Sequence, residues 1–299
     1  MRYKNIFGIA VAALMAMAGC NDAADERTPK RETLQACEMP LRFMAEHPGM
    51  SRVTATAFES GDRAGVFMTD AGVALEASGN RLNNELLTCE GADWTTARTL
   101  YWDEGEFDVF AYYPYDGELR VVDDVPFSVA RNQHAMVDDA GMDGYEASDF
   151  LWANSRGVAA SEEPVRLSFR HRMSRLVVRL VPGDDYEGDI PEDARVYVHN
   201  TVPEATIDLS VGLVTKDAYA SAETIEAKKE ETGKYAAIVV PQRLDNQVPL
   251  IEIVVEGVSY MVERKFVFKQ GIQHTVNVTL AKNPDQVKIE IGGEIEDWD

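Results

Sequence analysis

The chain has 299 residues, of which 45% are hydrophobic and 27% are charged, and this balance excludes a disordered tail and a membrane-embedded protein. Its 51 acidic residues against 29 basic ones give a formal net charge of −22. That charge argues against a nucleic-acid partner, because clustered Lys and Arg are what hold a phosphate backbone. Five histidines and three cysteines are few ligands for a multi-metal or redox enzyme.

The first twenty residues indicate export. Arg2 and Lys4 precede an apolar run over residues 6–18, which is shorter than the roughly 20 residues that a membrane-spanning helix needs. This pattern predicts a secretory signal over residues 1–19. Its end, Met17-Ala18-Gly19-Cys20, resembles a bacterial lipobox, with Met where Leu is more usual. We therefore expect Cys20 to be acylated (palmitate among the acyl groups) and the protein to be anchored without spanning the bilayer. An ordinary secretion signal that happens to contain a cysteine is the alternative.

Residues 20–36 read as a polar tether behind the lipidated cysteine. The acidic residues in it resemble a surface-export signal of some Gram-negative anaerobes, and a solvated linker explains them equally well. An exported compartment permits disulfides, so a Cys37–Cys89 bond is a candidate, although a separation of 52 residues does not fix its geometry.

The body of the chain is expected to be β-structure, because apolar and polar residues alternate with a period of two and helical periodicity is scarce. The clearest predicted strands are residues 64–68, 107–113, 127–130, 251–256, 275–280 and 287–291. Segment 107–113 is apolar on both faces, which indicates a central strand that ends before Pro114. Segment 223–231 lacks an apolar stripe and is predicted to be a loop or a marginal helix.

The polar stretch 154–163 before Pro164 suggests a domain boundary. Two antiparallel β-sandwich domains are therefore expected, over residues 37–160 and 161–299. Apolar positions after Val165 change parity between Met173 and Leu176, which predicts a β-bulge or sharp bend at 173–175.

The same region contains five arginines: Arg166, Arg170, Arg172, Arg175 and Arg179. A solvent-facing edge paired with acidic side chains is favoured over a stripe that binds an anionic ligand. His171 lies among apolar residues and is interpreted as an interior histidine with its hydrogen bonds satisfied.

The search for catalytic motifs is negative. Phosphate-binding glycine loops, H-E-x-x-H, C-x-x-C and the nucleophile elbow are all missing. The segment from Asp139 faintly resembles a calcium loop, but Gly141 and Phe150 stand where an EF-hand needs ligands. We predict no enzyme activity, no cofactor and no metal site.

Four segments in order resemble the fimbrillin family, the Mfa-like pilins and pilus-associated lipoproteins of Gram-negative anaerobes. They are Phe58-Glu59-Ser60-Gly61-Asp62 through Phe67, Phe107 through Tyr115, Ala147 through Ala153, and Leu167 through Leu176. The last matches L-x-F-x-H-x-M-S-K-L, with Arg175 where Lys is common.

This resemblance implies two tandem transthyretin-like β-sandwich domains and export through the periplasm as a lipoprotein to the cell outer membrane. It further implies that an Arg-directed protease removes a first strand, and that a strand of the neighbouring subunit fills the groove by donor-strand exchange. In this chain Leu41 and Phe43 belong to the candidate removable strand, 41–44, and Arg42 and Arg52 are candidate cleavage points, with Arg52 preferred. An anchor subunit that is never clipped is the alternative. The final strand, from Gln286 through Ile291 towards Trp298, is either a donor or an ordinary last strand.

Two functional classes follow. The first is a structural or accessory subunit of a fimbrium (pilus), whose partners are other fimbrial subunits and which serves cell adhesion. The second is a non-polymerising surface lipoprotein that binds a glycan or host protein through an aromatic platform. Trp94, Tyr101, Trp102 and Tyr145 are candidates for it if they are exposed, although aromatic residues in sandwiches more often belong to the core. An undetected hydrolase is the least favoured reading.

Overall fold

The computed structural model describes residues 35–47, 58–91, 93–137, 142–282, 288–290 and 295–297, the last two ranges by their backbone alone. Residues 35–299 form one compact unit. In its described part the helical elements are η1 (Ala36–Glu38) and α1 (Gly144–Ser148), and strands make up the other regular structure. The predicted all-β class is confirmed.

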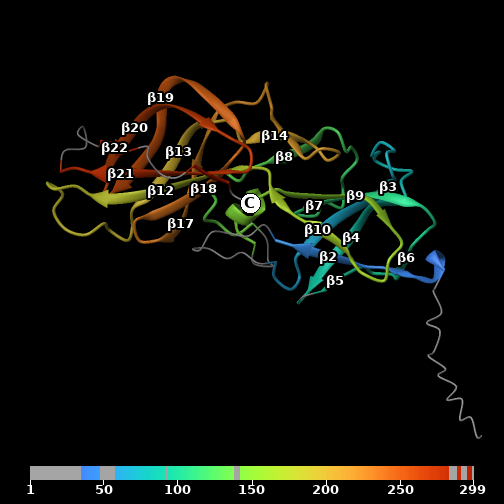
Figure 1. The fold of residues 1–299 in the computed structure, drawn as a ribbon. Coiled ribbons are helices and arrows are strands. Elements are labelled where there is room, and N and C mark those ends of the chain that lie inside the picture. The colour runs from blue at the N-terminus through green and yellow to red at the C-terminus, as the bar shows by residue number, and fades with distance from the viewer. Residues whose placement is uncertain are drawn as a thin grey trace, which may run out of the picture. The chain divides into compact units, whose positions relative to one another are not determined.

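The first half of the chain builds an eight-stranded sheet in the order β10-β2-β5-β4-β3-β7-β9-β11 (Figure 1). The strands are β2 (Phe43–Glu46), β3 (Arg63–Asp70), β4 (Leu82–Glu90), β5 (Asp93–Thr95), β7 (Glu106–Tyr113), β9 (Leu151–Ala159), β10 (Val165–Ser168) and β11 (Arg170–His171). The two outermost strands, β10 and β11, are separated along the chain by Phe169 alone. Because one residue spans only a few ångströms, the sheet must curl until its ends meet, and it encloses its own core. The short pair β1 (Pro40–Leu41) and β6 (Leu100–Tyr101) lies beside it.

Strand β7 is the central strand that its sequence predicts. It pairs with β3 on one side and β9 on the other, and every residue from Phe107 to Tyr113 is buried. Gly65 on β3 faces it, and a Cβ at that position would lie 2.6 Å from Asn84 Oδ1 and still closer to the Tyr112 ring. This close approach explains a glycine inside a strand.

The second half of the chain forms a sandwich whose core also takes in residues of the first half, such as Phe110 and Trp152. One sheet has the order β17-β18-β12-β21-β22, with β23 also on β21, and the other has the order β16-β13-β19-β20. Their strands are β12 (Ser174–Pro182), β13 (Arg195–Thr201), β16 (Glu223–Glu226), β17 (Lys228–Glu231), β18 (Lys234–Val239), β19 (Gln242–Val255), β20 (Val258–Phe268), β21 (Ile272–Leu280), β22 (Lys288–Glu290) and β23 (Ile295–Asp297). Residues such as Leu176 and Ile251, one from each sheet, share this core.

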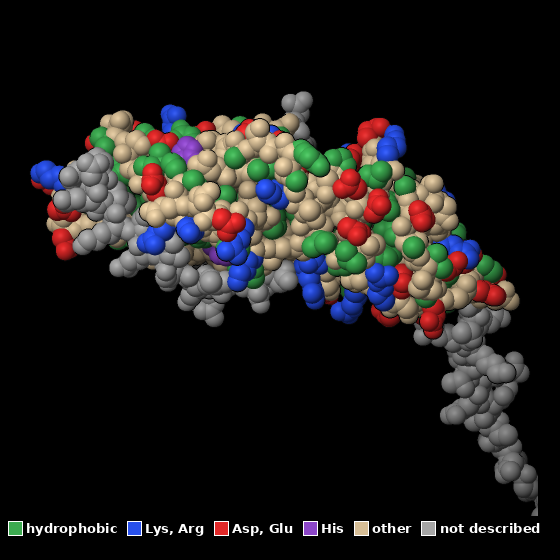
Figure 2. All heavy atoms as spheres, turned by 90° about the horizontal axis from the view of Figure 1, so that it is seen from above, with side chains coloured by type: hydrophobic (Ala, Val, Ile, Leu, Met, Phe, Trp, Pro, Cys, Tyr) green, Lys and Arg blue, Asp and Glu red, His purple; other side chains and the backbone are tan. Residues whose placement is uncertain are grey.

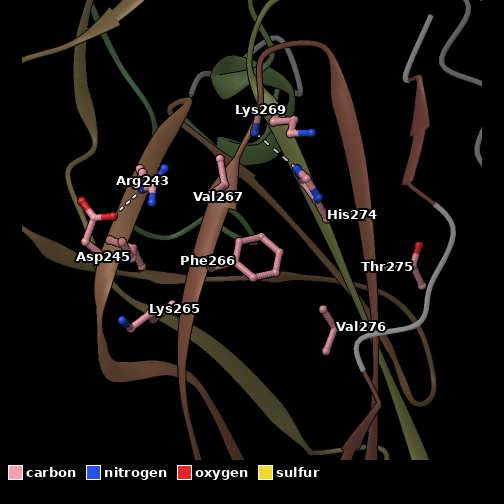
Figure 3. Close-up of a pocket in the computed structure, with 10 residues that line it drawn as sticks. Arg243, Asp245, Lys265, Phe266, Val267, Lys269, His274, Thr275 and Val276 are labelled. Carbon is pink, nitrogen blue, oxygen red and sulfur yellow. Dashed lines mark hydrogen bonds and ion pairs between the residues drawn. The ribbon is translucent and has the colours of Figure 1, made fainter.

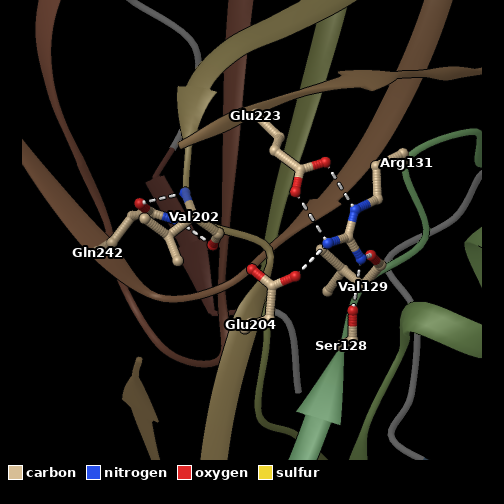
Figure 4. Close-up of polar contacts among 7 residues, drawn as sticks. All are labelled: Ser128, Val129, Arg131, Val202, Glu204, Glu223 and Gln242. Carbon is tan, nitrogen blue, oxygen red and sulfur yellow. Dashed lines mark hydrogen bonds and ion pairs between the residues drawn. The ribbon is translucent and has the colours of Figure 1, made fainter. Parts of the chain in front are cut away.

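Strand β8 (Val125–Ser128) precedes the predicted boundary but pairs with β14 (Glu204–Asp208), which also pairs with β15 (Leu213–Lys216). The loop after β8 is bonded to the second sandwich. Arg131 Nε lies 2.9 Å from Glu223 Oε2, and its guanidinium also contacts Glu204 (Figure 4). Buried Gln133 exchanges two hydrogen bonds of 2.7 Å with the backbone of Ile238. The two halves are therefore interleaved along the chain.

The change of parity near Met173 marks the crossing from one sheet to the other. Strand β11 ends at His171 and β12 begins at Ser174. Phe169 belongs to the first core and Met173 to the second. Strands β10 and β11 complete the first sheet, so a boundary after residue 160 would separate them from it.

Two local expectations need correction. Segment 223–231 is neither loop nor helix but forms the edge strands β16 and β17, because pairing with β13 and β18 overrides its polar composition. The arginine run is not uniformly solvent-facing. Arg175 is only 3% exposed and is ion-paired with Glu230, and the Arg172 guanidinium lies 4.6 Å from the centre of the Trp152 ring. Both signs of charge occur across the face shown in Figure 2.

Candidate functional site

Residues 40–46 are here called the N-terminal strand segment: β1 pairs with β6, and β2 fills a slot in the eight-stranded sheet. Strand β2 lies between β5 and β10. It runs parallel to β10, from Phe43 opposite Val165 to Glu46 opposite Ser168, and it meets β5 at the antiparallel pair Phe43–Trp94. Both edges of β2 are therefore covered by other strands.

The segment is anchored by two apolar side chains. Leu41 and Phe43 are each 5% exposed and belong to the core of the first sheet, whereas Arg42 between them is exposed. This alternation is the strand pattern in which every second side chain points inward. The predicted strand at 41–44 is thus present, interrupted at Arg42 between β1 and β2.

Polar contacts fix the register at the far end of β2. The Glu46 carboxylate accepts a hydrogen bond of 2.9 Å from Ser168 Oγ and lies 3.3 Å from Arg166 Nη1. Phe169 N donates to Glu46 O over 3.0 Å. The exposed ion pair contributes at most about 1 kcal/mol, so the apolar anchors carry most of the stabilisation.

An aromatic cluster around Phe58 lies at the end of the slot. Phe58 packs edge-on against Trp94, Tyr113 and Phe169, with ring centres 4.9, 5.6 and 5.4 Å away. His47, the last residue before the undescribed stretch 48–57, lies 4.9 Å from the same ring. Both ends of that stretch therefore start from one packed site.

The two candidate cleavage points differ in what a cut would release. Arg42 is exposed, and its guanidinium donates to Glu162 O. A cut after Arg42 would free β1 but leave β2 covalently joined to the body through residue 47. Arg52 lies outside the described residues, and a cut there would free the whole N-terminal strand segment.

The two cysteines do not form a disulfide. Cys37 is an exposed free thiol, and Cys89 is a buried free thiol on β4 that faces the core. Burial raises the pKa of the Cys89 thiol, so it is held neutral. The Cys37–Cys89 disulfide that the sequence allowed is therefore absent from the structure. Cys20 lies outside the described residues.

The proposed aromatic platform is not assembled. Trp94 and Trp102 are buried, and Trp102 Nε1 donates a hydrogen bond of 3.2 Å to Ser161 O. Tyr145 is half-buried, and Tyr101 alone of the four is exposed, at 55%. These tryptophans serve the core because aromatic rings supply large buried area there.

The final strands lie on the chain's own second sandwich. Both β22 and β23 pair antiparallel with β21, each over three residues. Trp298 lies outside the described residues.

Two features of the first sheet were missed on the sequence. The partner strand β10 was assigned to the second domain, because the alternation of Val165 and Leu167 does not say which sheet a strand joins. Asp108 stands in an apolar strand, and that single acid was the only signal. Its carboxylate accepts hydrogen bonds from Gly157 N, Gly72 N and Arg156, at 2.9, 3.1 and 2.9 Å. Burial opposes its ionisation, but these bonds outweigh burial and lower the pKa of Asp108.

Among the described residues the acidic and metal-binding side chains do not converge. They include no group of three or more His, Cys, Asp or Glu side chains placed to hold a metal ion. His171 is buried, and its Nδ1 lies 2.8 Å from Asp149 Oδ1, as expected of an interior histidine. No helix in this part of the chain is long and apolar enough to cross a membrane.

Comparison with protein families gives a match to the fimbrillin-like family over residues 51–298. The chain belongs to the fimbrillin-like family. The matched range includes β5 and β10, the strands that flank β2, but it begins after the N-terminal strand segment. Membership supports a fimbrial or cell-adhesion role for this fimbrillin-like protein. A search of curated proteins gives no match.

Solved structures agree on the fold. A proposed cell adhesion protein from Bacteroides ovatus superposes with a TM-score of 0.68 at 22% identity, covering 87% of this chain and 97% of the other. A second, from Bacteroides uniformis, has a TM-score of 0.66 at 19% identity, with coverage of 87% and 99%. A fimbrial protein from Bacteroides vulgatus has a TM-score of 0.52 at 12% identity, with coverage of 87% and 99%.

Proposed function

We propose that this fimbrillin-like protein is a structural or accessory subunit of a fimbrium that joins other subunits by β-strand addition at the slot filled by the N-terminal strand segment. The observation that supports the proposal is the seating of β2. Strand β2 is covered on both edges, and Leu41 and Phe43 anchor the segment, yet the segment is joined to the body through one stretch, 48–57, which contains Arg52.

Removal of this segment would leave an acceptor for another strand. Burying Leu41 and Phe43 stabilises the fold by about 1.5–3 kcal/mol each, and the pockets that they fill would become exposed. The facing edges of β5 and β10 would lose their backbone partners at the same time. Paired free edges with apolar pockets between them are what an extended strand from a neighbouring subunit recognises.

We propose residues 286–298 of a neighbouring subunit as the donor. In the described residues β22 and β23 are held to β21 by three paired residues each, so their release from their own sheet breaks few hydrogen bonds. The alternation of Val287, Ile289 and Ile291 suits a slot that takes every second side chain.

The assembly proposal is tested by placing a sequence-specific protease site within 48–57. After cleavage and loss of the N-terminal strand segment, the protein should form SDS-resistant ladders. The same site at Arg42, or in the exposed loop 184–189 of the second sandwich, should give none, because neither cut frees β2. Protein that loses residues 40–46 and stays monomeric would overturn the proposal.

Export as a lipoprotein on the outer membrane is proposed from Cys20 and the preceding residues. Membrane fractionation of cells that express Cys20→Ala tests it. The variant should move from the membrane fraction to the soluble fraction, while Cys37→Ala should stay with the membrane. Unchanged fractionation of Cys20→Ala would rule out acyl anchoring at this residue.

A further inference from the structure

The second sandwich opens where its two sheets part. Strands β20 and β21 are consecutive in the chain, but β20 belongs to the four-stranded sheet and β21 to the other sheet. They diverge from the turn after Lys269 and leave a cavity of about 350 Å³ between them (Figure 3). This volume lies within the range of pockets that hold small molecules, roughly 300–1,000 Å³.

The interior of this cavity is apolar. Leu244 from β19, Phe266 from β20 and Val276 from β21 line it, so all three strands contribute one core-type side chain. Phe266 points into the space between the strands in Figure 3. An apolar surface left open at the mouth of a sandwich favours an apolar occupant.

His274 forms one wall and carries no positive charge near neutral pH. Its Nε2 accepts a hydrogen bond of 3.3 Å from Lys269 N, which ties the ring to the turn. Burial, together with the charge of Lys269, lowers the pKa of His274 to about 4. The wall is thus a neutral ring, and the charges at the mouth come from other residues.

A bulge in the β19–β20 pair widens the mouth. Leu244 pairs with Phe266 and Val248 pairs with Arg264. Three residues of β19, from Asp245 to Gln247, therefore face a single residue of β20, and all three are exposed. Bulges of this kind re-aim side chains and recur beside binding sites.

The rim of the mouth is basic in an otherwise acidic protein. Arg243, Lys265 and Lys269 line it and are exposed, and Asp245, the one acid among the described lining residues, is ion-paired with Arg243. The two lysines are therefore the cations left to meet a ligand. In a chain with a net charge of −22, this gathering favours an anionic group at the mouth.

We propose that this cavity binds a small amphiphilic carboxylate, with its apolar body among Leu244, Phe266 and Val276 and its carboxylate at Lys265 and Lys269. Neither the strand slot nor assembly is needed for this binding, because the site is built entirely from the second sandwich. The ligand class follows from an apolar interior joined to a cationic rim.

Calorimetric titration of the full chain with octanoate at pH 7.5 and low salt tests the proposal. Saturable binding of one octanoate per chain is expected. The double variant Lys265→Glu/Lys269→Glu should weaken octanoate binding about tenfold or more by like-charge repulsion. Lys216→Glu, which changes an exposed lysine on β15, should bind octanoate like the unmodified protein.

Two further measurements separate the cavity from general surface charge. The neutral probe 1-octanol should bind the double variant and the unmodified protein equally, and Leu244→Trp should abolish binding of both probes by filling the cavity. Circular dichroism checks that each variant is folded. Octanoate binding that is undetectable, that survives the double charge reversal, or that survives Leu244→Trp in a folded protein would overturn the proposal.

Discussion

Replacing Phe43 by alanine should loosen the N-terminal strand segment more than any other single truncation within it. Phe43 is 5% exposed, lies opposite both Trp94 and Val165, and belongs to the core of the first sheet. Truncating a buried phenylalanine costs about 3–5 kcal/mol, because the apolar contacts are lost and the site does not fully collapse. In the intact chain this loss should appear in the free energy of unfolding.

In a chain cut within 48–57, the same loss of free energy weakens the binding of the cut segment to the rest of the protein. Each 1.4 kcal/mol changes an equilibrium constant about tenfold. Phe43→Ala should therefore raise the dissociation constant of the cut segment by a factor between about one hundred and a few thousand. A fluorophore on Cys37, which is exposed and precedes the segment, lets gel filtration follow release.

Met44→Ala is the matched control, because Met44 is the next residue of β2 and is only half-buried. It should cost about 1 kcal/mol in urea denaturation and change retention far less. The reasoning is refuted if the cut Phe43→Ala chain keeps its segment as tightly as the unmodified chain does. Equal losses from Phe43→Ala and Met44→Ala would also refute it, because burial could not then be the cause.

Three other substitutions probe the scaffold of the two sandwiches. Asp108→Asn should lower the free energy of unfolding at pH 7 by about 1.5–3 kcal/mol. Because the pKa of Asp108 lies below its ordinary 3.8, the difference in stability from the unmodified protein should shrink as the pH falls below about 4. The same difference in denaturation curves at pH 7 and pH 3 would contradict this. Arg175→Met should destabilise by about 1–3 kcal/mol, because the buried Glu230 carboxylate on β17 loses its guanidinium partner and keeps Lys234 as its cation. An unchanged urea midpoint would show that the Arg175–Glu230 pair contributes nothing. Gly65→Ala should lower the free energy of unfolding by about 1–3 kcal/mol, because the new methyl group presses against the Tyr112 ring. Gly117→Ala is the control: the nearest atom to its new Cβ would be 3.5 Å away, so the melting temperature should stay nearly unchanged.

Local patterns were sufficient where a strand is decided by its own residues. The apolar run from Phe107 to Tyr113 predicted a buried central strand, and β7 is one. The change of parity at Met173 predicted an irregularity, and the chain leaves one sheet for the other at that residue. Four ordered segments were sufficient to suggest the family that comparison then showed.

Local sequence patterns did not predict the structure of segments whose conformation or burial depends on the strands that pair with them. Segment 223–231 contains mostly charged residues, yet β13 and β18 recruit it as edge strands. Trp94 and Trp102 were platform candidates only if exposed, and they are buried; a sequence does not tell which face of a strand is covered. The spacing of Cys37 and Cys89 allowed a bond, but the fold leaves Cys37 exposed and Cys89 buried, both as free thiols.

The sequence by itself determined the all-β class and the buried strand at 107–113, because alternation and apolar runs along one strand are local properties. Only the tertiary structure decided that β2 lies between β5 and β10, and that β10 belongs with the first sheet. It also decided that β20 and β21 diverge to leave an apolar cavity with a basic rim. Backbone hydrogen bonds between strands are the same for every side chain, so partner choice and inter-sheet gaps arise from how the whole chain packs.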